Sequence, residues 1–136
     1  MAQSVLIRIH FAIHSSKSDP KTYAFSNSFT IPIPTNFSLR NSGTWLEFPN
    51  GDRLWRIQIS VAQAKGLMLL YDKFYLPPSS KLFVYSPDEK QLLGAYTTRN
   101  NNKNKRFLTG IIDGNSAVVE YYEPKLVRGQ GTFQVF

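Results

Sequence analysis

The sequence contains no cysteine, only two histidines and no apolar run long enough to cross a bilayer. Without cysteine it can form neither a disulfide framework nor a thiolate metal site, and the redox compartment stays open because many secreted domains also lack cysteine. A spanning helix needs about 20 apolar residues. The opening "MAQSVLIRIHFAIH" interrupts its apolar residues with arginine and histidine. We therefore expect no membrane span and no intact signal peptide.

The scarcity of histidine also limits metal binding and catalysis. His10 and His14 belong to a segment with alternating apolar residues, which is typical of a strand. On a strand they lie about 13 Å apart, too far to share one ion. No serine has the Gly-x-Ser-x-Gly context of a nucleophile, and Glu120 and Glu123 close a strand whose ordinary interpretation is a solvated face. The sequence therefore predicts no metal site, no cofactor and no enzymatic activity.

Alternation of apolar and polar residues is the main pattern that is present. The segments "WRIQISV" and "SAVVEYYEP" each place apolar side chains at every second position, as half-buried strands do. Between "TWLEF" and "RLWRIQI" lies "PNGD", and Asn-Gly readily supplies the positive φ angles of a hairpin turn. With ten Phe and seven Tyr to fill a core, these short strands predict an all-β fold, a single antiparallel β-sandwich that is jelly-roll-like.

The length of 136 residues predicts one domain. Residues 1–38 are expected to form an N-terminal strand and an extended connector rich in Ser, Asn and Pro, and residues 39–136 the β-sandwich. The tail "GQGTFQVF" is apolar and strand-like to its end. We expect an unfinished strand there, with apolar side chains that lack a partner, and hence a fragment of a longer protein.

The run from Arg99 to Arg106 contains four basic residues among four asparagines, and the net charge of the chain is +7. Such residues contact phosphates when other cations converge on the same face. The run has no aromatic residue for base stacking, however, and the other cations are scattered along the chain. We interpret Gly94 to Asn101 as a strand that turns through the asparagines, followed by a solvated connection, and we expect no nucleic-acid partner. The candidate binding residues are Trp45, Arg99, Asn100 and Asn101.

Three segments from about Leu39 to Glu123 carry a resemblance to a known family. They are "LRNSGTWLEFPNGDRLWRIQI", "LMLLYDKFYLPPSSKLFVYSPDEKQLLGAYTTRNN" and "FLTGIIDGNSAVVEYYEP". Their order and spacing resemble a non-catalytic domain that precedes the protease domain in secreted bacterial trypsin-like serine proteases, including lysyl-endopeptidase-like ones. The shared pattern includes a Gly-x-Trp opening and a closing Glu-Tyr-Tyr-Glu-Pro strand.

The resemblance implies a jelly-roll-like β-sandwich that acts as a pro-region or accessory domain of a serine endopeptidase. It implies a secreted or cell-surface location, the C-terminal protease domain of the same precursor as partner, and contact with a protein or glycan substrate. The alternative is a carbohydrate-binding or adhesion module of the same architecture. In that case exposed aromatic side chains, with Trp45 the first candidate, stack on sugar rings.

Overall fold

The computed structural model describes residues 7–8, 13–14, 29–30 and 33–135. Within these residues the chain forms short strands and two 3-10 turns, and none of its helices is long or apolar enough to span a membrane. The elements are β1 (Ile7–Arg8), β2 (Ile13–His14), β3 (Phe29–Thr30), β4 (Phe37–Ser38), β5 (Thr44–Glu47), β6 (Arg53–Ser60), β7 (Gly66–Leu67), β8 (Leu70–Tyr75), β9 (Lys81–Tyr85), β10 (Leu92–Tyr96), η1 (Thr98–Asn100), β11 (Phe107–Leu108), β12 (Ile112–Asp113), β13 (Ser116–Glu123), η2 (Lys125–Val127) and β14 (Thr132–Val135).

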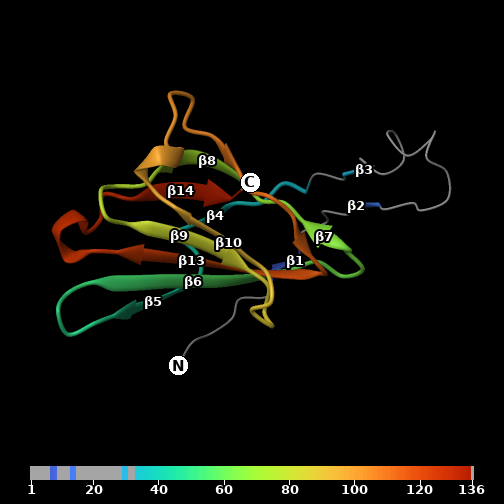
Figure 1. Ribbon diagram of the computed structural model, residues 1–136, viewed down its shortest axis with the longest axis horizontal. Helices are drawn as coiled ribbons and strands as arrows, with labels where there is room; N and C mark the ends of the chain where they lie inside the picture. The colour runs from blue at the N-terminus through green and yellow to red at the C-terminus, as the bar shows by residue number, and fades with distance from the viewer. Residues whose placement is uncertain (1–6, 9–12, 15–28, 31–32, 136) are drawn as a thin grey trace.

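The strands form two principal sheets that face each other (Figure 1). The main sheet has the order β1-β6-β13-β9-β10, and β5 also pairs with β6. The second sheet has the order β11-β8-β14-β4. All neighbouring strands of the second sheet pair antiparallel. In the main sheet every pair is antiparallel except β1 with β6, which is parallel. The chain crosses from the main sheet to the second and back several times, so the prediction of an all-β, jelly-roll-like sandwich is confirmed.

The predicted hairpin joins β5 to β6. Phe48 and Asp52 pair through their backbones, and the amide of Gly51 donates to the carbonyl of Phe48 at 2.9 Å. Gly51 has a φ of +93°, whereas Asn50 does not adopt a positive φ. The Asn50 side chain instead accepts a hydrogen bond from the Asp52 amide at 3.0 Å. The turn is therefore a three-residue loop with a left-handed glycine, in which asparagine acts through its side chain.

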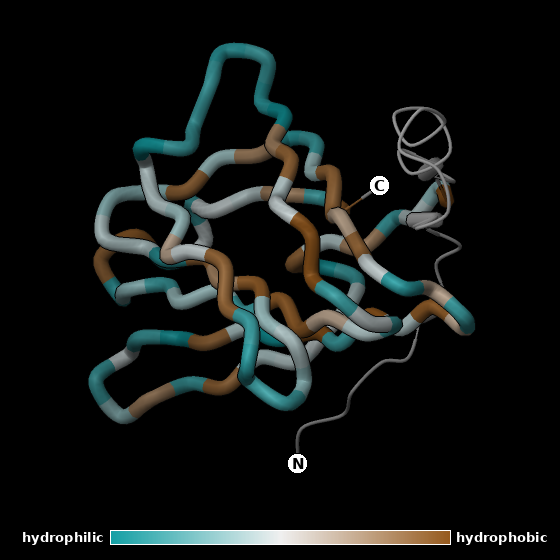
Figure 2. Tube along the Cα trace, turned by 45° about the vertical axis from the view of Figure 1, so that its right-hand side comes forward, coloured by the Kyte–Doolittle hydropathy of each residue, from teal (hydrophilic) through white to brown (hydrophobic). Residues whose placement is uncertain are grey.

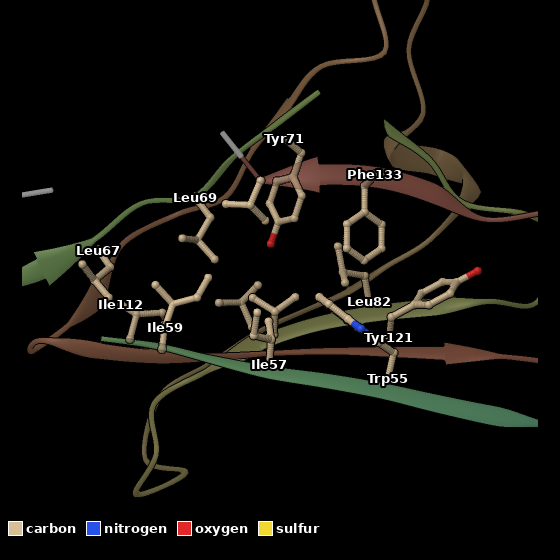
Figure 3. Close-up of a cluster of buried hydrophobic side chains, with 14 of the residues drawn as sticks. Trp55, Ile57, Ile59, Leu67, Leu69, Tyr71, Leu82, Ile112, Tyr121 and Phe133 are labelled. Atoms are coloured by element: carbon tan, nitrogen blue, oxygen red, sulfur yellow. The ribbon is translucent and has the colours of Figure 1, made fainter. Parts of the chain in front are cut away.

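The core lies between the two sheets, as Figure 3 shows. Alternation on β6 and β13 places their apolar side chains in register on one face, with Trp55 opposite Tyr121. The second sheet contributes Phe133, whose ring meets those of Trp55 and Tyr121 edge to face at 5.5 Å between centroids. These contacts confirm the inward faces predicted from the sequence. The buried apolar residues on this face of the two strands are Trp55, Ile57, Ile59, Ala117, Val119 and Tyr121. Val118, an even-numbered position of β13, is buried as well.

Tyr71 is the one core ring whose polar end has no hydrogen-bond partner among the residues that the structure describes. It is fully buried on β8, and burial raises the pKa of its phenol. The hydroxyl stays protonated, and its desolvation opposes the gain from burying the ring.

Two segments at the ends of the chain add strands to this framework. Within residues 1–38, β1 pairs with β6 in parallel and β4 pairs with β14. His10 and most of this segment lie outside the described residues. At the other end, Phe133 and Val135 are buried in the core. The expectation that the apolar side chains of the tail lack a partner is wrong for these two, because β14 lies between β8 and β4.

Candidate functional site

An open cleft of about 720 Å³ lies where β5 and β6 of the main sheet approach β4 and β14 of the second sheet. Both sheets and the loops beside them contribute side chains. The residues that define its chemistry are Arg40, Trp45, Arg53, Lys73, Glu123 and Phe133. We call this feature the edge cleft.

Trp45 forms part of the wall of the edge cleft and is held from three sides. Its indole Nε1 donates to the carbonyl of Leu39 at 3.0 Å, and its ring meets that of Tyr121 edge to face at 6.3 Å. The guanidinium of Arg53 lies 4.0 Å from the ring centroid. One face of the indole is thus covered by a cation, so the pair presents a charged surface as well as an aromatic one.

Arg53 also forms an ion pair with Glu123 inside the cleft. Its Nη2 and Nε atoms donate to Glu123 Oε1 at 2.5 and 3.1 Å. The same oxygen accepts from the amide of Gly129 at 3.1 Å, and Oε2 accepts from the Tyr121 hydroxyl at 3.1 Å. Burial and the neighbouring Glu123 carboxylate raise the pKa of Tyr121, so its phenol remains a donor. Both oxygens of this carboxylate are occupied within the protein.

The placement of Glu123 corrects the sequence interpretation. Only 1% of its side chain is exposed, so the expectation of a solvated face is wrong for this residue. Glu123 continues the odd-numbered positions of β13, whose earlier members Val119 and Tyr121 are buried in the core. Extending that alternation by one step identifies Glu123 as inward-facing, and the same rule on β6 places Arg53 on the face of Trp55.

The other glutamate of β13 lies on the opposite face of the main sheet. Glu120 Oε1 accepts from Arg56 Nη2 at 2.6 Å and from the Tyr85 hydroxyl at 3.1 Å. This cluster borders a smaller depression of about 310 Å³ on the outer face. Because Glu120 and Glu123 project from opposite faces, they do not form the carboxylate pair that glycoside hydrolysis requires.

Arg99, Asn100 and Asn101 lie at η1 and do not line the edge cleft with Trp45. Asn100 is a capping residue, since its side chain accepts from the Thr97 amide at 2.9 Å. Asn101 pairs with the backbone of Leu76, accepting from its amide at 2.8 Å and donating to its carbonyl at 2.9 Å. Two of the candidate binding residues thus make hydrogen bonds that hold the turn and the end of β8, while Arg99 is exposed.

The connection after η1 extends from the sandwich as the hydrophilic loop at the top of Figure 2. Residues 102–106 are exposed, as predicted for a solvated connection. The loop is nevertheless folded on itself, because Asn102 donates to the carbonyl of Arg106 and Asn104 accepts from the Arg106 amide.

Replacing Asn101 by alanine is expected to destabilise the fold by about 1–3 kcal/mol, because Leu76 is buried and would lose both backbone partners. Urea unfolding measures this change. As a control, Lys103, Lys105 and Arg106 are replaced together by serine, which should alter stability by about 0.5 kcal/mol or less. A loss in the triple variant equal to that of Asn101→Ala would contradict the distinction between turn and loop.

The described residues contain no group of three or more His, Asp or Glu side chains that could hold a metal ion. Comparisons with models of protein families, with curated proteins and with solved structures find no match. The function is therefore argued from the edge cleft and from the residues that build it.

Proposed function

We propose that this chain is a non-catalytic accessory or pro-region β-sandwich domain of a secreted bacterial trypsin-like serine endopeptidase of the lysyl-endopeptidase-like kind. It binds the protease domain of the same precursor and assists its folding, masks it or engages its substrate. The sequence resemblance over about residues 39–123 is the origin of this proposal.

One observation carries the proposal furthest: two widely separated segments of the resemblance meet in the edge cleft. The first segment supplies Trp45 and Arg53, and the closing strand supplies Glu123. The contacts between them are the 4.0 Å stack of Arg53 on Trp45 and the 2.5 Å ion pair of Arg53 with Glu123. These charged groups bind one another, which suits a binding module better than an active site that must activate water or a nucleophile.

The proposal is tested on the gene and on the protein. In the gene, the reading frame that continues downstream of this chain should encode the His, Asp and Ser of a trypsin-like protease. That protease domain, refolded with and without this chain, should differ in active yield or in peptide hydrolysis. A frame that stops near Phe136 or continues into an unrelated enzyme would refute the proposal, as would equal yield and activity in both refolding reactions.

A carbohydrate-binding or adhesion module is the second candidate, and the position of Trp45 in the wall of an open cleft favours it. This function predicts binding on a glycan array that is lost in Trp45→Ala. Phe83, a half-buried ring on the outer face, provides the control, since Phe83→Ala should keep that binding. Absence of any glycan signal would remove this candidate.

A further inference from the structure

The edge cleft carries positive charge that the described residues do not neutralise. Arg40 and Lys73 line it, are exposed and form no ion pair within residues 33–135. Arg53, the third cation there, is paired with Glu123. Two uncompensated cations in one concave site attract an anionic partner and select against a cationic one.

Glycines form part of the same wall. Gly129 has a φ of +79°, and its backbone amide already points into the site toward Glu123. A Cβ atom on Gly131 would collide with the hydroxyl of Tyr121. Glycine at position 131 therefore makes room for Tyr121. At Gly129 an added Cβ would meet no atom within 4 Å, so its bare backbone lies beside open space, which lets another main chain approach closely. The cleft volume of about 720 Å³ is within the range of sites that enclose several groups of a ligand.

We propose that the edge cleft is a docking site for an acidic peptide segment, with carboxylates at Arg40 and Lys73 and its main chain along Gly129. This inference rests on the proposed function and specifies the partner chemistry of that site. A peptide suits the cleft better than a neutral sugar does. Arg53 covers one face of Trp45, so the pair does not offer both ring faces for stacking, whereas carboxylates complement the two open cations.

The binding test uses two matched peptides and two matched double variants. The probe is an acetylated peptide of alternating Asp and Ser, and its partner has Asn in place of Asp. Arg40→Gln with Lys73→Asn removes the cleft cations, while Lys103→Gln with Lys105→Asn removes the same charge from the exposed loop. Lys73 and Lys105 both have a left-handed backbone, with φ angles of +52° and +56°. Asparagine tolerates this conformation, so each double variant introduces it at a residue with the same backbone conformation.

We expect the Asp peptide to bind at least about tenfold more tightly than the Asn peptide in calorimetry. The cleft variant should lose about tenfold in affinity, and the loop variant should stay within about twofold because its charges lie outside the site. Circular dichroism melting of both variants confirms that they are folded. Binding of the Asp peptide should also weaken from 50 to 500 mM salt, on the order of severalfold, since exposed charges are screened.

Several results would overturn the inference. These are equal binding of the two peptides, equal losses in the two double variants, or no binding of the Asp peptide. Tighter binding of a uronic-acid oligosaccharide would show that the occupant is a glycan. If the protease domain still depends on this chain in the refolding assay while the cleft variant behaves as wild type there, the inference fails and the proposed function stands.

Discussion

Arg53→Ala is expected to destabilise the protein by about 3–5 kcal/mol, the largest loss that we predict for a single charge. The substitution would leave the Glu123 carboxylate, whose side chain is 1% exposed, without its two guanidinium donors. It would also remove the cation that packs on Trp45. Chemical denaturation, together with the near-ultraviolet circular dichroism of the tryptophans, measures both effects.

The chain provides a matched control for this substitution. Arg56 faces Glu120 on the same two strands with the same pair of guanidinium donors, but on the outer face, where its side chain is 47% exposed. Arg56→Ala is therefore expected to change stability by about 1 kcal/mol or less. Replacing both members of the inner pair, Arg53→Met with Glu123→Leu, should recover much of the loss because no charge is left buried. Equal losses for the two single variants would contradict the role of burial.

Gly43→Ala is expected to destabilise the fold by about 2–5 kcal/mol, since two unfavourable effects act at the same atom. Gly43 has a φ of +74°, which disfavours any residue with a Cβ atom by about 1–2 kcal/mol. That Cβ would lie 2.5 Å from Nε1 of Trp55, a fully buried ring whose Nε1 donates to the Ser42 carbonyl. Overpacking in a close-packed core adds about 1–3 kcal/mol. Thermal melting gives the total.

A second glycine separates the two contributions at Gly43. Gly114 has a φ of +95°, but an added Cβ would meet no atom within 4 Å. Gly114→Ala should therefore show only the backbone contribution of about 1–2 kcal/mol. If both alanine variants melt at the same temperature, the contact between Gly43 and Trp55 does not restrict this position.

Local patterns predicted most of the fold. The alternation on β6 and β13 identified the inward faces, and the Asn-Gly pair located the hairpin, because both depend on neighbours a few residues apart. The edge cleft depends instead on contacts between residues that are far apart in the sequence. Glu123 has the residue type of a surface position, and its partner Arg53 is 70 residues away, so only the strand register brings them together.

Asn101 shows the same limit on a smaller scale. An asparagine next to a turn is ordinarily assigned to the turn itself, and the sequence made it a candidate for ligand contact. Its actual partner, the backbone of Leu76, is 25 residues earlier in the chain. Side chains that complete a backbone pairing in this way have no periodic signature, and they are recognised only when the two segments lie side by side.

The position of β6 between β5 and β13 has a consequence for the order of folding. Its pairing with β5 closes a short hairpin, an event of the microsecond range, whereas its pairing with β13 joins residues 56 to 70 positions apart. Closing so long a loop has an entropic cost before any contact is gained, and non-local pairings slow the folding of all-β domains. The hairpin can therefore form early, while the edge cleft, which needs β13 in place, is completed only in the late steps of folding.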